Sequence, residues 1–198
     1  MPLPAWPFLA PSFLMVGTIE PRKGHDQVLS AFEHLWEGGS QARLVIVGKH
    51  GWQVDSLMTH IKKHPEAGKR LIWLESVGDD ELLGVYARCQ VLLAASFGEG
   101  FGLPLIEGAR HGLPIIARDI PVFREVAGEH AFYFKADRPE DLARELTLWM
   151  DLAAKGDAPC SNGLEWLTWE KSAVQLWAEI DRCRALVGSR LTGPLDLK

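Results

Sequence analysis

The sequence predicts an α/β fold in which a Rossmann-like parallel sheet of about six strands is flanked by helices. Two features support this prediction: short apolar runs recur roughly every 20 to 30 residues, and the segments between them have the apolar spacing of helices. Runs that are apolar almost throughout are typical of strands covered on both faces. Strands that alternate with helices form parallel sheets, because each helix returns the chain to the same edge of the sheet.

The six predicted strands are short apolar runs with few charges. In chain order they are 13–17 (FLMVG), 43–48 (RLVIVG), 70–74 (RLIWL), 91–96 (VLLAAS), 113–118 (LPIIAR) and 131–134 (AFYF). With 198 residues, of which 47% are hydrophobic, the chain is long enough to bury both faces of such a sheet in one domain.

Helices are predicted between these runs. Segment 26–39 places Val28, Phe32 and Leu35 on one stripe and ends on glycines, and segment 54–64 has a similar stripe. Further helices are predicted at 79–89, 104–112, 139–156 and 164–188, with a short one after Asp119. The helix at 164–188 is rich in tryptophan, so it either packs on the sheet of this domain or covers a partner domain.

Composition limits the partners and the location of the protein. A formal net charge of -5 and a pI of about 5.8 argue against binding of nucleic acid, which needs a basic face. The three cysteines, Cys89, Cys160 and Cys183, form no CxxC pair and predict neither a disulfide framework nor a zinc site. No signal peptide or membrane span is recognised. We expect a cytoplasmic protein, with contact at the inner face of the membrane left open.

The beginning of the chain predicts a domain boundary. Four prolines fall within the ten residues PLPAWPFLAP, a composition typical of an extended linker. We therefore expect residues 1–12 to be a linker from a missing N-terminal domain. Residues 13–188 are expected to form the Rossmann-like domain, and residues 189–198 a tail.

Two loops carry the residues of chemical interest. The first, GTIEPRKGHD (17–26), follows the first predicted strand and presents Arg22 and Lys23 just before a helix. Two cations at the start of a helix favour an anion, because they add to the positive end of the helix dipole, and phosphate is the expected ligand. The loop is neither GxGxxG nor GxxxxGK[ST], which disfavours NAD binding and ATP hydrolysis.

The second loop, SFGEGFGLPLIEGA (96–109), follows the fourth predicted strand. It turns at Gly100 and Gly102 and enters a helix, with Glu99 on the loop and Glu107 about one turn inside the helix. Glycines let backbone N–H groups approach a ligand, and carboxylates accept hydrogen bonds from hydroxyl groups. The pattern favours a phosphorylated, polyhydroxylated ligand. No Asp-x-Asp or histidine partner completes a metal site here, whereas a hydrolytic pair of carboxylates stays geometrically open.

Several motifs together resemble a known family. The stretch EGFGLPLIE, followed by GARHGLPIIARDIPVFREVAG, resembles the Glu-x7-Glu signature of the group 1 (family 4) retaining glycosyltransferases of the GT-B fold, and GTIEPRKG resembles their phosphate loop. The likeness extends from Phe13 to about Trp177 and covers only the C-terminal, donor-binding half of such an enzyme. It implies a metal-independent hexosyltransferase without a cofactor, whose acceptor-binding N-terminal domain is missing, so that this chain alone has little or no activity.

The resemblance also implies the ligands. The donor would be a nucleotide sugar, with GDP-mannose favoured by the stretch VGTIEPRKG and a UDP-sugar as the alternative. The acceptor would be a polysaccharide or glycolipid bound through the N-terminal domain. Two other functions stay open: a non-catalytic module that binds a nucleotide or sugar phosphate, and a sugar-nucleotide epimerase of the same fold.

The family's functional residues are transferred position by position. Lys23, with help from Arg22, would hold the donor pyrophosphate, Glu107 would bind the ribose hydroxyls, and Glu99 would face the transferred sugar. The other residues expected to contact the donor lie in the phosphate loop (Gly17, Thr18), after the second strand (Gly48, Lys49), beside the base (Val77, Asp79) and at the glycine turn (Gly100, Phe101, Gly102, Leu103).

One position departs from the family pattern. Many members have an arginine directly after the glycine that ends the first strand, whereas this chain has Thr18. Threonine carries no charge, so we hypothesise that Arg22 compensates for it.

Other residues near these loops have simpler expected roles. His25 and His111 are expected to be surface or capping residues, and Cys89 a core residue. Asp119 is expected to cap the short helix that follows it, with contact to the donor sugar as the alternative.

Overall fold

The computed structural model of the protein describes the backbone of residues 10–191 and the side chains of residues 10–185. Most of the predicted linker (1–12) and most of the predicted tail (189–198) therefore lie outside the described residues. The chain forms two compact units: the first ends at Leu164 and contains the sheet, and the second begins directly after it.

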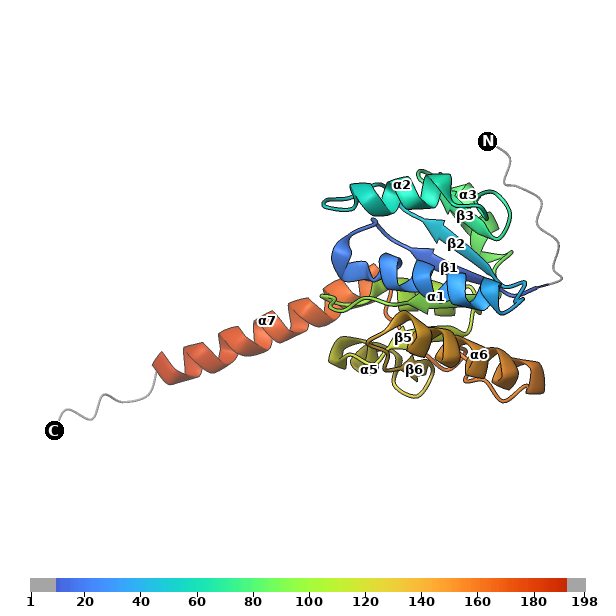
Figure 1. Ribbon diagram of the computed structural model, residues 1–198. Coiled ribbons are helices and arrows are strands. Elements are labelled where there is room, and N and C mark those ends of the chain that lie inside the picture. Colours follow the sequence, from blue (N-terminus) through green and yellow to red (C-terminus); the bar gives the residue numbers. More distant parts are fainter. Residues whose placement is uncertain (1–9, 192–198) are drawn as a thin grey trace. The chain divides into compact units, whose positions relative to one another are not determined.

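The first unit is built on a six-stranded parallel sheet, as predicted (Figure 1). Its strands are β1 (Ser12–Val16), β2 (Arg43–Val47), β3 (Leu71–Leu74), β4 (Val91–Ala94), β5 (Ile115–Arg118) and β6 (Phe132–Phe134). The strand order is β3-β2-β1-β4-β5-β6, so the direction in which strands are added reverses between β1 and β4. Ligands of parallel α/β sheets bind outside the carboxyl ends of the strands at such a reversal.

Helices cover both faces of this sheet. They are α1 (His25–Glu37), α2 (Asp55–Lys63), α3 (Asp79–Tyr86), α4 (Leu103–Arg110), α5 (Pro121–Ala127) and α6 (Pro139–Lys155). Side chains of α1, α2 and α6 join one core cluster with Phe13 and Met15, whereas those of α3, α4 and α5 join a second cluster with Leu14. Consecutive residues of a strand point to opposite faces, so the unit has three layers with the sheet in the middle.

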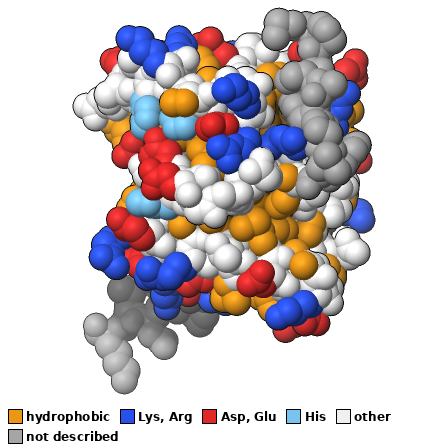
Figure 2. All heavy atoms as spheres, turned by 45° about the vertical axis from the view of Figure 1, so that its right-hand side comes forward, with side chains coloured by type: hydrophobic (Ala, Val, Ile, Leu, Met, Phe, Trp, Pro, Cys, Tyr) orange, Lys and Arg blue, Asp and Glu red, His pale blue; other side chains and the backbone are white. Residues whose placement is uncertain are grey.

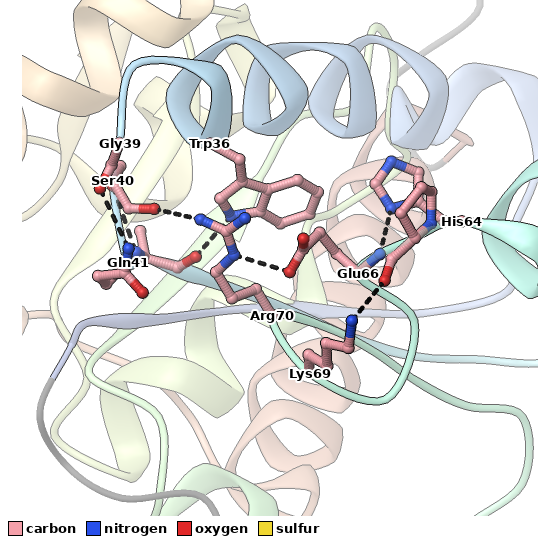
Figure 3. Close-up of polar contacts among 10 residues, drawn as sticks. Trp36, Gly39, Ser40, Gln41, His64, Glu66, Lys69 and Arg70 are labelled. Atoms are coloured by element: carbon pink, nitrogen blue, oxygen red, sulfur yellow. Dashed lines mark hydrogen bonds and ion pairs between the residues drawn. The ribbon is translucent and has the colours of Figure 1, made fainter.

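The amino-end edge of the sheet is fixed by Arg70, which directly precedes β3. Its Nη1 donates to the carbonyl of Ser40 at 2.7 Å and its Nε to Glu66 at 2.8 Å (Figure 3). The guanidinium also lies 5.4 Å from the ring centroid of Trp36. Arg70 thus ties the turn after α1 to the start of β3, at the edge opposite the carboxyl ends of the strands.

The second unit contains helix α7 (Trp169–Leu191), which begins later than the start predicted at 164. Thr168 explains this start, because its hydroxyl accepts the backbone N–H of Lys171 at 3.3 Å. Among the side chains that are described, Trp169 and Trp177 are exposed. Whether α7 covers another domain stays a prediction.

The surface carries mixed charge. On the face shown in Figure 2, lysine and arginine side chains stand beside aspartate and glutamate, with hydrophobic atoms between them. Within the described part of the chain, no helix is both long and apolar enough to cross a membrane.

The three cysteines differ in burial, which predicts a labelling pattern. Cys89 is buried, as expected, and burial raises the pKa of its thiol to about 12, whereas Cys160 and Cys183 are exposed. Because the thiolate is the reactive form, we expect a maleimide at pH 7 to modify Cys160 and Cys183 quickly and Cys89 only after unfolding. Mass spectrometry of the native protein checks this. Fast modification of all three thiols without denaturant would contradict the burial of Cys89.

Candidate functional site

The two loops singled out in the sequence meet at the reversal between β1 and β4. Lys23 Nζ lies 2.5 Å from Glu99 Oε1, and Arg22 Nη1 lies 2.9 Å from Glu99 Oε2. Arg22 Nη1 also donates to the carbonyl of Gly98 at 3.2 Å, and the backbone N–H of Phe97 donates to that of Arg22 at 2.8 Å. The cations of the first loop therefore contact one of the two acids singled out in the second loop, Glu99.

Glycines make this close approach possible. The first loop forms a short 3-10 turn, Pro21–Lys23, and ends at Gly24 in the left-handed region (φ 73°), where α1 begins. A Cβ atom on Gly24 would lie 2.5 Å from the carbonyl oxygen of Ala95, so only glycine lets the two loops touch here. At the second loop, Gly102 has φ 89° and directly precedes α4.

Gly48, predicted to line the site, has a structural role at the end of β2. A Cβ on it would lie 1.9 Å from the carbonyl oxygen of Gly17. We expect Gly48→Ala to lower the free energy of unfolding by roughly 3 kcal/mol or more, because backbone rather than a flexible side chain must move. Urea denaturation measures this. Gly78→Ala is the control, since nothing lies within 4 Å of its Cβ; equal losses in the two variants would contradict the packing described here.

The charges of the site form two opposed pairs, the cations Arg22 and Lys23 and the carboxylates Glu99 and Glu20. Burial alone would raise the pKa of Glu99, but hydrogen bonds from Lys23, Ser96 and Arg22 outweigh it and hold that pKa below its ordinary value. Ser96 donates to Glu99 Oε1 at 2.7 Å. Arg22 Nε also pairs with Glu20 at 3.0 Å, so two carboxylates face the two cations. Glu99 is thus ionised at neutral pH and held by three donors.

A small cavity of about 20 Å³ lies beneath these groups, lined by Lys23, Ser96 and Glu99 together with His25 and apolar strand residues. Pockets that enclose small molecules measure about 300 Å³ or more, so this cavity alone is too small to hold such a ligand.

His25 corrects a prediction made from the sequence. It was expected at the surface or as a cap, but it is only 2% exposed, and neither ring nitrogen has a hydrogen-bond partner within the described residues. Burial, aided by the charge of Lys23, lowers the pKa of His25 to about 4. The imidazole is therefore neutral at physiological pH, because the first turn of α1 points it into the sheet.

Glu107 comes from α4 and has a different partner. The hydroxyl of Tyr86, at the end of α3, donates to Glu107 Oε2 at 3.0 Å. The ring of His111 stacks on that of Tyr86 with 4.4 Å between centroids and 17° between planes. Glu107 is partly buried and does not line the small cavity with Glu99.

The remaining predicted site residues lie at the same carboxyl edge of the sheet. The ammonium of Lys23 lies over Gly17, where an added Cβ would be 3.7 Å from Nζ. Val77 is partly buried just before α3 and packs against the second core cluster. The exposed members of the set are Thr18, Lys49, Asp79, Gly100, Phe101 and Leu103, the last two of which open their apolar side chains to solvent.

Arg118, at the end of β5, is a residue that the sequence prediction missed. Its guanidinium is buried and donates to the carbonyls of Ala95 at 3.0 Å and Ala136 at 2.9 Å, and to the side chain of Gln27. It also lies 4.0 Å from the ring centroid of Phe97. Arg118 therefore holds the base of the loop that carries Glu99.

Asp119 also differs from its expected role. It does not cap α5, whose N-cap residue is Ile120 without a side-chain cap. Instead Asp119 pairs with Arg124 at 2.7 Å and with Lys135 at 3.3 Å, and the hydrogen bond from Arg124 is the main cause that lowers its pKa to about 2. Arg124 and Lys135 thus occupy the Asp119 carboxylate in place of the backbone N–H groups of α5.

One group of side chains in the described part of the chain has the spacing of a metal site. It consists of Glu33 of α1, His60 of α2 and His64, which directly follows α2. Nδ1 of His64 accepts the backbone N–H of Glu66 at 3.1 Å (Figure 3). The neutral ring then carries its proton on Nε2, which faces Glu33 Oε1 at 3.2 Å. This tautomer favours a hydrogen bond to Glu33 over metal coordination through the same nitrogen.

The fold and the site together define a class of protein. A parallel sheet of this strand order, with cations and acids gathered where the order reverses, is a Rossmann-like ligand-binding domain. The family described as "Glycosyl transferases group 1" matches residues 10–164. The chain therefore belongs to the group 1 glycosyltransferase family, as its motifs indicated.

Several named relatives are mannosyltransferases. The chain is 53% identical over 164 residues to the serotype-specific mannosyltransferase WbdA of Escherichia coli, a match that covers 83% of this chain and 20% of the relative. It is 33% identical over 120 residues to O-antigen chain mannosyltransferase B of Escherichia coli, covering 59% of this chain and 30% of the relative. The chain thus spans only about a fifth of the length of WbdA.

Solved structures share the fold. The C-terminal domain of a group 1 glycosyl transferase (LpcC) from Francisella tularensis aligns with a TM-score of 0.63 and 19% identity, over 77% of this chain and 80% of that chain. Sucrose-phosphate synthase from Thermosynechococcus elongatus aligns with a TM-score of 0.72 and 21% identity, over 91% of this chain and 47% of that chain. At this identity the likeness concerns the fold alone.

Proposed function

We propose that this chain is the donor-binding domain of a retaining, metal-independent mannosyltransferase that uses GDP-mannose. The observation that carries the proposal is the meeting of Arg22, Lys23 and Glu99 at the strand-order reversal of a group 1 glycosyltransferase domain. The identity to WbdA, which is named a mannosyltransferase, supports mannose as the sugar. The acceptor would be a surface polysaccharide or glycolipid at the cytoplasmic face of the membrane, bound by another part of the full-length protein.

In this proposal Lys23 and Arg22 act on the leaving group. Glycosyl transfer develops positive charge at the sugar carbon and negative charge on the departing diphosphate. Lys23 is the main phosphate ligand, because its ammonium is held over Gly17 by Glu99 and is largely sheltered from water. Arg22 is more exposed and shared with Glu20, so its part is auxiliary, and it stands in for the charge that Thr18 lacks.

The acids and the glycine turn would bind the sugar and the ribose. Glu99, which is ionised and fixed by three donors, can accept hydrogen bonds from hydroxyl groups of the transferred sugar. Glu107 would accept the ribose hydroxyls. The backbone N–H groups at the start of α4 point toward the carboxyl edge and lack partners within their own helix, so they suit sugar and phosphate oxygens. Gly102, the N-cap residue of α4, and Leu103, its first residue, carry such N–H groups, whereas Pro104 has none. Phe101 lies just before the helix, and its N–H is the third proposed donor of this turn.

The nucleotide base would lie on the β2–β3 side of the site. Val77 and Asp79, at the start of α3, are the proposed base contacts, and Lys49 follows β2 at the same edge. Gly48 supports this side by its packing on Gly17.

Calorimetric titration tests the proposal. We expect GDP to bind this chain, and to bind more tightly than UDP, with GDP-mannose competing for the same site. If neither GDP nor UDP binds to this chain or to the full-length protein, the donor-binding role is refuted. Tighter binding of UDP would refute the choice of GDP-mannose and leave the rest in place.

A further inference from the structure

We infer that Tyr86 is a positioning residue that orients the carboxylate of Glu107 for the ribose of the donor. The inference rests on the proposed function, since it presumes that Glu107 accepts the ribose hydroxyls. Its basis is the hydrogen bond of 3.0 Å from the Tyr86 hydroxyl to Glu107 Oε2, which joins α3 to α4 across 21 residues of sequence.

The phenol ring is held on all sides. Tyr86 is 2% exposed and belongs to the core cluster formed by α3, α4 and α5 with the sheet. His111 stacks on the ring in a nearly parallel arrangement. Glu107 lies on α4 and His111 is the residue directly after that helix, so this segment contacts Tyr86 twice, at its hydroxyl and at its ring face. A hydroxyl held this firmly fixes the carboxylate that it contacts.

In this pair Tyr86 is always the hydrogen-bond donor and Glu107 the acceptor. Burial is the main cause that raises the pKa of Tyr86 far above its ordinary value, and the charge of Glu107 and the hydrogen bond to it add to the effect. The phenol therefore keeps its proton and remains a donor. A carboxylate offers about four acceptor positions, and the phenol occupies one of them on Oε2. The carboxylate therefore keeps acceptor capacity for the two ribose hydroxyls while its rotation is restrained. Restraint before binding improves affinity, because less side-chain freedom is lost when the ligand arrives.

The test compares two nucleotides that differ only in the ribose hydroxyls. The affinity of this chain for GDP and for 2′,3′-dideoxy-GDP is measured by calorimetry in the unsubstituted protein, Tyr86→Phe and Tyr133→Phe. Tyr133 is the matched control, because its hydroxyl donates to the carbonyl of Phe123 at 3.0 Å and not to Glu107. We expect Tyr86→Phe to weaken GDP binding about 10-fold and to leave dideoxy-GDP binding unchanged, whereas Tyr133→Phe changes the preference between them little.

The outcomes separate the inference from the proposed function. If the unsubstituted protein binds the two nucleotides equally, the ribose role of Glu107 fails, and the role of Tyr86 fails with it. If that protein prefers GDP and Tyr86→Phe keeps the same preference, the inference about Tyr86 is overturned and the proposed function stands.

A second variant covers the case in which Tyr86→Phe does not fold, as judged by circular dichroism. His111 is exposed, so His111→Ala removes the stacking ring without opening the core. We expect it to weaken GDP binding about two- to three-fold and dideoxy-GDP binding not at all. An unchanged preference for GDP in a folded His111→Ala protein would then overturn the inference.

Discussion

Lys23→Ala is expected to weaken GDP binding about 100-fold, the largest effect on ligand binding that the structure predicts. The ammonium is largely sheltered from water, and a charged hydrogen bond to a phosphate in such a place contributes about 2–3 kcal/mol. The fold should survive, because Glu99 retains its hydrogen bonds from Arg22 and Ser96. Calorimetry with GDP, together with a thermal unfolding curve, measures both effects.

Lys155→Ala is the matched control for this change. Lys155 is an exposed lysine in the last turn of α6, and it lines neither loop of the site. The control is expected to bind GDP as the unsubstituted protein does. Equal affinities for GDP in the Lys23→Ala and Lys155→Ala proteins would show that the first loop does not hold the phosphates.

Arg22 should matter less than Lys23. Its side chain is 46% exposed, and its charge is shared between Glu99 and Glu20. Solvent screens such a pair, so the loss of Arg22 should cost only a few-fold in GDP affinity. An Arg22→Ala protein with unchanged affinity would count against the hypothesis that Arg22 compensates for Thr18.

The stability of the protein is expected to fall by about 3 kcal/mol between pH 6.5 and pH 4 through His25 alone. Its pKa is about 4 in the folded state, against an ordinary value of 6.5. Between these values the unfolded chain binds a proton that the folded protein excludes. The neutral, buried ring therefore favours folding above pH 6.5, and this contribution is lost as the pH falls toward 4.

His25→Phe isolates this effect from the other titrating groups. Phenylalanine has a ring of similar size, and it loses no hydrogen bond, because neither ring nitrogen of His25 has a partner within the described residues. Free energies of unfolding are measured by urea denaturation at several pH values. The difference in free energy of unfolding between the two proteins should be constant above pH 7. At lower pH the variant should become more stable relative to the unsubstituted protein. A difference independent of pH would show that His25 is not buried as a neutral group.

The fold and the meeting of the two loops could be predicted from the sequence because both depend on short-range patterns. Near-continuous apolar runs marked each strand of the sheet, as the buried residues of β2 and β4 illustrate. The loops after β1 and β4 carried unusual clusters of glycine and charge. Parallel strands place their carboxyl ends along one edge, and the loops that follow β1 and β4 therefore both lie at that edge.

The parts that could not be predicted depend on distant side chains. The contact between Tyr86 and Glu107 requires the crossing of α3 and α4, which no local pattern reveals. Arg118 lies in an apolar run and reads as the end of a strand, yet its acceptors come from three other segments. His25 follows two cationic residues in the sequence, but the left-handed turn at Gly24 directs its ring inward. For Arg118 the one signal in the sequence was a charged residue at the end of an apolar strand.

The central claim is that two distant loops hold one nucleotide-linked sugar. A crystal structure of this chain with GDP-mannose tests it most directly. We predict a diphosphate within hydrogen-bond distance of Lys23 Nζ and of the first N–H groups of α4, with the mannose against Glu99 and the ribose against Glu107. A nucleotide bound elsewhere, with Lys23 and Glu99 still paired only to each other and to their protein neighbours, would contradict it.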